Sequence, residues 1–264
     1  MSVLAVIPAR QAASRFPGKP LADLHGLPMV MHCYYRARLA NLIDDIVIAT
    51  CDEEIARVAH DFEVPVVMTS EEHLTAVDRA AEAVQHHKKT RADLPEVVLL
   101  VQGDEPLLEP TILDLMVSTI TSDSTINVLN VMVPFARYED FEDPNNPKVV
   151  INARGDALYM SREAVPSAWR SWDASIAHMQ TGLFAFRPAA LQLFADTPRT
   201  SVETAESIDM LRLLHAGHQV RMLPVDEPSI GVDTPQDLAK VADLMVEDRH
   251  LHRYRDAAAR SRSQ

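Results

Sequence analysis

The chain has 264 residues, of which 47% are hydrophobic and 24% charged, and its formal net charge at pH 7 is -13. This composition is typical of a globular protein, and the acidic balance disfavours nucleic acid, because phosphate backbones are bound through excess Lys and Arg. No apolar run approaches the roughly 20 residues that span a bilayer, no signal-peptide pattern opens the chain, and Cys33 and Cys51 fit no metal or disulfide pattern. We therefore expect a cytoplasmic protein that binds neither membranes nor nucleic acid.

The first half of the chain alternates short, β-branched apolar runs with helical patterns, in the order β-α-β-α-β-α-β. We expect strands at 3–7, 46–50, 64–68 and 97–101, with intervening helices that begin at 28, 52 and 76. Right-handed crossovers then predict a Rossmann-like, mostly parallel central sheet with helices on both faces.

The second half of the chain is less regular. Two apolar segments, 148–151 and 157–160, flank the turn sequence A-R-G-D and predict a β-hairpin. The sheet is therefore expected to become mixed, with this small hairpin as an insertion. The remaining predicted strands are 127–133, 180–186 and 220–224. The remaining predicted helices are 111–121, 203–216 and 235–247, and one more that begins at 188.

The loop after the first predicted strand is cationic. It contains Arg10, Arg15 and Lys19, and residues 1–38 hold five Lys and Arg against one acid, Asp23, in an acidic protein. At the carboxyl edge of an open α/β sheet, where ligands bind, such a loop can cradle a polyphosphate. The alternative interpretation is a solvated basic turn.

Two aspartates follow predicted strands. Asp104 comes after V-V-L-L-V-Q-G, and Asp233 lies in S-I-G-V-D-T-P. Carboxylates at the same edge as a triphosphate-binding loop suit Mg²⁺, which takes one or two carboxylates together with phosphate oxygens. The alternatives are a turn or cap aspartate for Asp104 and the N-cap of the last helix for Asp233.

Five blocks in order carry a resemblance to a known family: I-P-A-R at 7–10, S-R-F-P-G-K-P-L at 14–21, V-Q-G-D-E-P at 101–106, A-L-Y-M-S-R at 157–162 and G-V-D-T-P-Q-D-L at 231–238. From residue 3 to about 244 the chain resembles the bacterial CMP-Kdo synthetases (3-deoxy-manno-octulosonate cytidylyltransferases). The resemblance implies a nucleotidyltransferase-type fold and transfer of CMP from CTP to an acidic acceptor, Kdo or a related sugar acid, with release of pyrophosphate. It also implies Mg²⁺ as cofactor and a homodimer.

The resemblance assigns site residues as well. It implies that Arg10, Lys19, Asp104 and Asp233 are catalytic and that the two aspartates hold the metal. The CTP-binding residues it implies are Ala9, Arg10, Ser14, Arg15, Lys19, Arg79 and Gln102. It further implies a single cytidylyltransferase domain at 1–248, with an acceptor and dimerisation subregion at about 134–190, followed by a charged C-terminal tail at 249–264.

The chain departs from the family where the acceptor is expected. The family segment His-x-Ser-Gly-Thr-acid-Arg corresponds to residues 73–79 of this chain, which lack the Gly. Phe184 stands where the family has a Tyr, and Gln180 stands where it has a His. Met210 replaces a Gln, and Asp209 replaces a longer Glu. Each lost hydrogen-bond partner of a buried sugar hydroxyl costs on the order of 1–3 kcal/mol. By resemblance, the acceptor-side residues are Lys148, Arg162, Gln180, Phe184, Asp209 and Met210.

These departures leave the acceptor open. One hypothesis keeps Kdo or a close sugar acid; another is a small phosphonate, such as phosphonoformate in phosphonate antibiotic biosynthesis, held by cations. Candidate cations are Arg79, Lys148, Arg162 and Arg212, each of which could instead belong to an ion pair. A non-catalytic nucleotide-binding protein is a third hypothesis, disfavoured because the metal and phosphate residues are all present.

Overall fold

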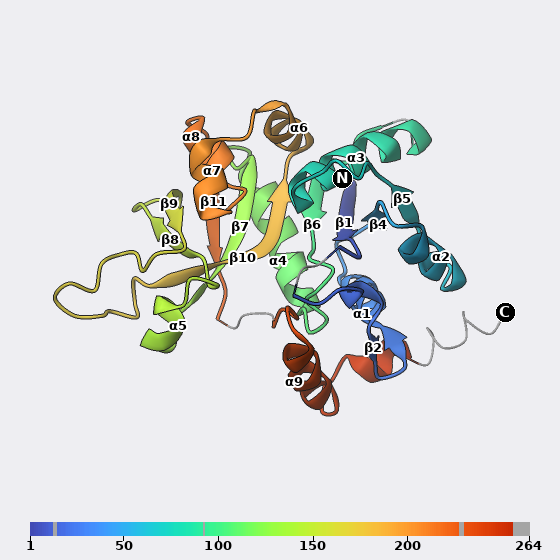
Figure 1. Ribbon diagram of the computed structural model, residues 1–264. Helices are drawn as coiled ribbons and strands as arrows, with labels where there is room; N and C mark the ends of the chain where they lie inside the picture. The colour runs from blue at the N-terminus through green and yellow to red at the C-terminus, as the bar shows by residue number, and fades with distance from the viewer. Residues whose placement is uncertain (13–14, 92, 227–229, 256–264) are drawn as a thin grey trace. The chain divides into compact units, whose positions relative to one another are not determined.

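The computed structural model describes residues 1–12, 15–91, 93–226 and 230–255 (Figure 1). The chain forms two compact units, Met1–Leu115 with Ser229–Gln264, and Met116–Pro228, and the boundary between them falls within helix α4 (Pro110–Ser122). No helix among the described residues is long and apolar enough to cross a membrane. The predicted domain limits remain a prediction.

The first unit is built on parallel strands, as predicted. Their order is β6 (Val97–Leu100), β1 (Val3–Ala9), β4 (Asp45–Thr50) and β5 (Val66–Met68). Residues 3–7 of β1 are almost completely buried, which explains their unbroken apolar sequence. The crossover helices are α1 (Met29–Ala37), α2 (Glu53–Asp61) and α3 (Ala76–Arg91).

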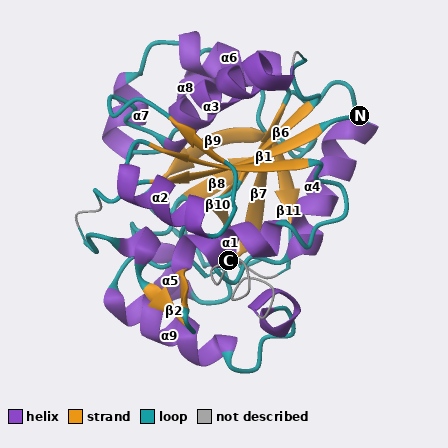
Figure 2. Cartoon of the chain, turned by 90° about the vertical axis from the view of Figure 1, so that its right-hand side faces the viewer, coloured by secondary structure: helices purple, strands orange, loops and turns teal. Residues whose placement is uncertain are grey.

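The direction of the crossovers reverses at β1. From β1 the chain passes through α1 to β4 and through α2 to β5, and α3 then returns past β1 to β6 on its other side. Figure 2 shows α1 and α3 on opposite sides of β1. The loops that follow β1 and β6 therefore diverge at the carboxyl ends of these strands, which is where open α/β sheets bind ligands.

Gly103 allows the loop after β6 to approach the end of strand β1 closely. A Cβ atom at this position would lie only 2.6 Å from the carbonyl oxygen of Pro8 in β1, so any side chain would push the loop away from the strand. The glycine of V-Q-G-D-E-P therefore sets the distance between this loop and β1.

The rest of the first unit supports these loops. The turn η1 (Lys19–Leu21) precedes a small hairpin, β2 (Asp23–Leu24) and β3 (Leu27–Pro28). Helix α9 (Pro235–Met245) begins with a capping box in which Thr234 is the N-cap. The alternative interpretation of Asp233 as that N-cap is therefore wrong, and its carboxylate is available for other contacts.

The second unit has a mixed sheet, as predicted. Strand β7 (Val128–Pro134) pairs in parallel with β11 (Arg221–Pro224) and antiparallel with β10 (His178–Phe186). The predicted hairpin is confirmed as β8 (Lys148–Ile151) and β9 (Ala157–Ser161), and β8 also pairs with β10. Helix α5 (Tyr138–Glu142) lies between β7 and β8.

The helix predicted at 203–216 is wrong as a single element. After α6 (Pro188–Asp196) the chain forms α7 (Ser201–Glu206) and α8 (Leu211–His215), separated at Ser207, whose φ is 52°. The Arg162 guanidinium donates to the carbonyl oxygens of Glu206 and Ser207, at 2.6 and 3.3 Å. A distant arginine thus satisfies the carbonyl groups that the helix end leaves without partners.

Candidate active site

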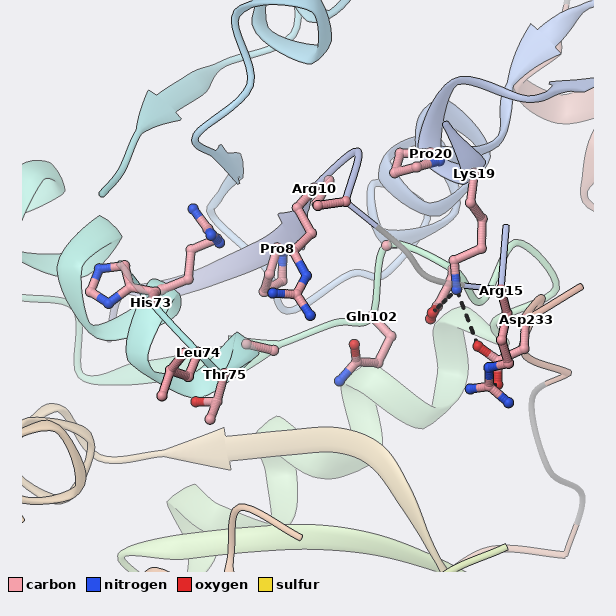
Figure 3. Close-up of a pocket in the computed structure, with 16 residues that line it drawn as sticks. Pro8, Arg10, Arg15, Lys19, Pro20, His73, Leu74, Thr75, Gln102 and Asp233 are labelled. Atoms are coloured by element: carbon pink, nitrogen blue, oxygen red, sulfur yellow. Dashed lines mark hydrogen bonds and ion pairs between the residues drawn. The ribbon is translucent and has the colours of Figure 1, made fainter. Parts of the chain in front are cut away.

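A pocket of about 440 Å³ lies at the carboxyl ends of β1 and β6 in the first unit (Figure 3). Figure 3 shows His73 at one end, Arg15, Lys19 and Asp233 at the other, and Arg10 and Gln102 between them. Its lining residues are Pro8, Ala9, Arg10, Ala12, Arg15, Lys19, Pro20, His73, Leu74, Thr75, Ala76, Arg79, Gln102, Gly103, Asp104 and Asp233.

The three cations of the loop after β1 differ in their environments. Arg10 directly follows β1, is exposed, and has no hydrogen bond or ion pair with any described residue. Arg15 pairs with Asp233 at 3.0 Å, and both side chains are about half exposed, at 56% and 52%. Lys19 follows Gly18, whose φ of 76° turns the chain into η1, and its side chain is only 11% exposed.

The two predicted metal-binding carboxylates converge on the Lys19 ammonium group. Its Nζ lies 2.7 Å from Asp104 Oδ2, 3.3 Å from Asp233 Oδ1 and 2.6 Å from the carbonyl oxygen of Val232. The backbone N–H of Val232 also donates to the Asp104 carbonyl oxygen, at 2.9 Å, which holds the two loops together. The loops after β6 and before α9 thus point hard oxygen atoms at one positive charge.

These residues fit a Mg²⁺ ion. The ammonium group lies within hydrogen-bond distance of both carboxylates, and carboxylate oxygens are the ligands that Mg²⁺ prefers. Within the described residues, no three His, Cys, Asp or Glu side chains cluster as they would around a metal held by protein alone. The pair therefore suits a metal that shares its ligands with phosphate oxygens and water.

The opposite wall of the pocket is the segment from His73 to the start of α3. The Thr75 hydroxyl accepts from the Asp78 N–H at 3.1 Å, as an N-cap does, so the positive end of α3 borders the pocket. Arg79 is 3% exposed, and its Nη1 donates to Thr69 Oγ1 at 2.5 Å and to the Ser70 carbonyl oxygen at 3.2 Å.

Glu82 does not line the pocket, but its carboxylate holds Ser70 and His73 in place on the same wall. Its Oε2 accepts from the Ser70 N–H at 2.8 Å and contacts His73 Nε2 at 2.5 Å. Burial alone would raise the pKa of Glu82, but the hydrogen bonds from Ser70 and His73 hold it below its ordinary value. The carboxylate is therefore ionised while it positions this wall.

The structure brings eight sequence-predicted residues into this pocket: Ala9, Arg10, Arg15, Lys19, Arg79, Gln102, Asp104 and Asp233. Ser14 lies outside the described residues. Sequence reasoning did not identify two contributors to the site. The Val232 carbonyl oxygen accepts from Lys19 through the backbone, and Glu82 holds Ser70 and His73 without lining the pocket. It associated the segment 73–79 with the acceptor and Arg79 also with CTP; His73–Ala76 and Arg79 line the same pocket as the three cations, and their roles remain predictions.

Of the candidate acceptor-side cations, Arg79 lines the pocket of the first unit, and the other three belong to the second unit, where they are bonded to protein atoms. The Lys148 ammonium is buried and donates to the carbonyl oxygens of Asp143 and Arg162, at 2.7 and 2.8 Å, and burial lowers its pKa. Arg162 donates to three carbonyl oxygens, those of Glu206, Ser207 and Pro144. Arg212 forms a buried two-donor ion pair with Glu203, at 2.7 and 2.9 Å.

The remaining acceptor-side candidates in that unit include two core residues. Met210 is 0% and Phe184 is 4% exposed, and the Phe184 ring stacks near Phe186. Gln180 Nε2 donates to the Thr181 carbonyl oxygen at 2.6 Å, beside a register shift between β7 and β10. Asp209 is half-buried just before α8. Their roles in acceptor binding remain predictions.

A cationic loop and paired aspartates thus meet at the switch point of a parallel sheet, where open α/β sheets bind ligands. The model of the Cytidylyltransferase family matches residues 4–223. The chain is 38% identical over 255 residues to the 3-deoxy-manno-octulosonate cytidylyltransferase of Geobacter metallireducens, covering 93% of this chain and 98% of that protein. It is 40% identical over 249 residues to the protein of that name from Nitratidesulfovibrio vulgaris, covering 92% and 96%.

A solved structure of CMP:2-keto-3-deoxy-manno-octonic acid synthetase complexed with CTP matches with a TM-score of 0.84 and 32% identity, covering 94% of this chain and 99% of that one. This likeness confirms the predicted nucleotidyltransferase-type fold. The chain belongs to the cytidylyltransferase family and is a nucleotidyltransferase.

Proposed function

We propose that the protein transfers CMP from CTP to Kdo, 3-deoxy-manno-octulosonate, and releases pyrophosphate. The observation that carries this proposal is the pocket in which Asp104, Asp233 and the three loop cations meet at the carboxyl ends of β1 and β6. The named relatives and the CTP complex of a similar enzyme support the choice of nucleotide and acceptor.

The side chains of the pocket suit nucleotidyl transfer by positioning and charge neutralisation. In the proposed reaction an acceptor hydroxyl oxygen attacks the α-phosphorus and loses its proton to solvent. The bond from the α-phosphorus to the oxygen of the β-phosphate breaks, and pyrophosphate leaves. Arg10 offers an exposed guanidinium group to the phosphates, and Arg15 and Lys19 supply further positive charge beside it. The mechanism needs no covalent enzyme intermediate.

We assign Asp104 and Asp233 as the residues that hold Mg²⁺. A bound Mg²⁺ neutralises charge that develops on the phosphate oxygens. The role of the chain is to present two carboxylates from different loops, with Lys19 and Arg15 hydrogen-bonded to them.

The second unit offers no support for a small phosphonate acceptor. A small dianion would need cations with free donors, but Lys148 and Arg162 donate to carbonyl oxygens and Arg212 is held by Glu203. Kdo is therefore the acceptor that we propose.

Exposed apolar side chains on the second unit support a homodimer. Leu158 and Tyr159 on β9, and Trp169 and Ile176 in the loop before β10, are 60%, 39%, 90% and 54% exposed. Large exposed apolar side chains of this kind are candidates for a protein interface. We propose that two chains associate through this loop and β9. Sedimentation of Trp169→Ser tests this, because the variant dimer should dissociate into monomers at a higher protein concentration than the unchanged dimer.

The use of CTP also supports the cytoplasmic location expected from the sequence.

The function is tested by following pyrophosphate release from CTP and Mg²⁺ with Kdo or phosphonoformate as acceptor. Kdo should give pyrophosphate and a product with the mass of CMP-Kdo, whereas phosphonoformate should give neither. Asp104→Asn is the control for a contaminating activity. A protein that binds CTP but releases pyrophosphate with phosphonoformate alone, or with neither acid, contradicts the proposal.

A further inference from the structure

Lys19 is held more completely by the protein than the binding of a phosphate group requires. An ammonium group has three N–H donors. Three protein oxygen atoms surround Lys19 Nζ: Val232 O at 2.6 Å, Asp104 Oδ2 at 2.7 Å and Asp233 Oδ1 at 3.3 Å. All three donors are thus used within the protein, and the side chain is only 11% exposed.

Arg10 provides a contrast within the same pocket. It is exposed and has no partner among the described residues, so its guanidinium group is free to meet a phosphate. Of the two residues, Arg10 is the one prepared for an incoming anion, and Lys19 is the one that neutralises the carboxylates.

We propose that Lys19 competes with the divalent metal for Asp104 and Asp233, so that the metal binds together with the nucleotide rather than before it. The inference rests on the proposed function, because it takes the two aspartates as the metal ligands. A carboxylate oxygen that accepts from the ammonium at 2.7 Å faces a positive charge already. Mg²⁺ needs such an oxygen at about 2.0–2.1 Å, where it would meet the like charge of Lys19.

The charge balance of the pocket supports this order. Lys19 and Arg15 together carry two positive charges and contact the two negative charges of Asp104 and Asp233. A divalent ion alone would leave this balanced group with an excess of positive charge. A nucleotide triphosphate that arrives with the metal restores the balance, and its oxygens give the Lys19 donors new acceptors.

The test measures Mn²⁺ binding to the full-length, nucleotide-free protein, by the electron paramagnetic resonance signal of free Mn²⁺. Lys19→Met removes the ammonium group and keeps the length of the side chain. It should bind Mn²⁺ at least about tenfold more tightly than the unchanged protein, a change of about 1.4 kcal/mol. Lys19→Gln is the second variant, because Gln retains a donor for the Val232 carbonyl oxygen if the Met variant does not fold.

Two controls separate competition from general electrostatics. Arg10→Met removes a positive charge from the same pocket without touching either carboxylate, so it should change Mn²⁺ affinity much less than Lys19→Met. The double variant Lys19→Met with Asp104→Asn should lose the gain. Equal affinities in Lys19→Met and the unchanged protein, an equal gain in Arg10→Met, or a gain that survives Asp104→Asn would each overturn the proposal.

The result is separable from the test of the proposed function. Mn²⁺ binding is measured without CTP or acceptor, whereas the function is judged by pyrophosphate release from the unchanged protein. A protein with the Lys19 effect and no pyrophosphate release would overturn the function alone. Turnover without the Lys19 effect would overturn only the competition.

Discussion

The most exposed charged side chains of the pocket in the first unit contrast with two charged acceptor-side candidates of the second. In the pocket, Arg10 is free among the described residues, and Asp104 and Asp233 remain 32% and 52% exposed. In the second unit, Lys148 and Arg212 are buried and bonded to the protein. The pocket therefore offers accessible charged groups to a ligand, whereas Lys148 and Arg212 already have protein partners.

Substitution of a pocket carboxylate should have the largest effect and should leave the fold intact. Asp104→Asn removes a carboxylate assigned to the metal, so kcat should fall by about a thousandfold or more. The free energy of unfolding should change little, because Lys19 keeps Asp233 and the Val232 carbonyl oxygen as partners. Pyrophosphate release and urea denaturation measure the two quantities.

Asp61→Asn is the matched control, since it removes an exposed carboxylate that, among the described residues, pairs only with Arg57 on α2. It should leave turnover unchanged. Full turnover in Asp104→Asn would remove the metal assignment.

Substitution of a buried charge in the second unit should mainly lower the free energy of unfolding. Arg212→Met removes both guanidinium donors from the buried Glu203 carboxylate, which retains the weaker contacts of the Thr200 N–H at 3.3 Å and of Arg199 at 3.6 Å. It also removes the guanidinium group that lies 3.9 Å from the centre of the Phe194 ring. Breaking a buried pair in this way costs about 3–5 kcal/mol. Urea denaturation should show the loss.

Arg137→Met is the matched control, because it breaks an ion pair of the same two-donor geometry at an exposed position. Arg137 donates twice to Asp140, at 2.9 and 3.0 Å, but its side chain is 65% exposed. Loss of such a surface pair costs about 0–1 kcal/mol. Equal losses in the two variants would contradict the distinction between buried and exposed charge.

A buried histidine should make the stability of the first unit depend on pH. His32 Nε2 contacts the Leu24 carbonyl oxygen at 2.7 Å and Nδ1 contacts the Tyr254 hydroxyl at 2.8 Å, which suits a neutral ring that donates once and accepts once. Burial lowers the pKa of His32 from 6.5 to about 4. Because the unfolded chain binds the proton more readily, stability is full above pH 6.5 and is lost as pH falls toward 4, by about 3 kcal/mol.

His32→Gln should remove this part of the pH dependence, since Gln does not titrate. Between pH 6.5 and 4 the variant should lose about 3 kcal/mol less than the unchanged protein, as measured by urea denaturation at each pH. His60→Gln, at an exposed position of α2, should not alter the slope. Parallel curves for all three proteins would contradict the assignment.

The sequence predicted the parts of the fold and site that local patterns encode. Apolar strands, the A-R-G-D hairpin and the side chains at the strand ends, Arg10 and Asp104 among them, follow from residue types over short windows. Parallel strands bring the carboxyl ends of β1 and β6 to one edge, so the distant blocks around Lys19 and Asp104 meet there. Asp233 follows no described strand and reaches Lys19 from the loop before α9, which the strand pattern did not predict.

The parts that were missed depend on contacts between distant backbone atoms. The break at Ser207 is stabilised by Arg162, 45 residues away in sequence. Lys148 is buried because two carbonyl oxygens surround its ammonium group, and every residue carries such a carbonyl. A sequence pattern indicates which side chains are present but not which backbone atoms will bond them.

Restoring a family residue in the core of the second unit should cost stability. Met210 is 0% exposed, so Met210→Gln buries an amide group, at a cost of about 1–3 kcal/mol if it finds no partner. Met68→Gln, at a position 42% exposed on β5, should change the free energy of unfolding by less than about 0.5 kcal/mol. A stable Met210→Gln variant with a lower KM for Kdo would instead place residue 210 in the acceptor pocket.

The smallest effect on turnover should come from Glu82, whose carboxylate acts on the pocket only through Ser70 and His73. Glu82→Gln keeps an acceptor for the Ser70 N–H but weakens the contact with His73, so the wall should shift and the KM for CTP should rise by about tenfold with kcat nearly unchanged. Glu72→Gln, the same substitution at an exposed position of the same loop, should leave KM unchanged. A fall in kcat at constant KM would show that Glu82 acts on the reacting groups, because a residue that only positions the nucleotide wall alters binding of the ground state and the transition state alike.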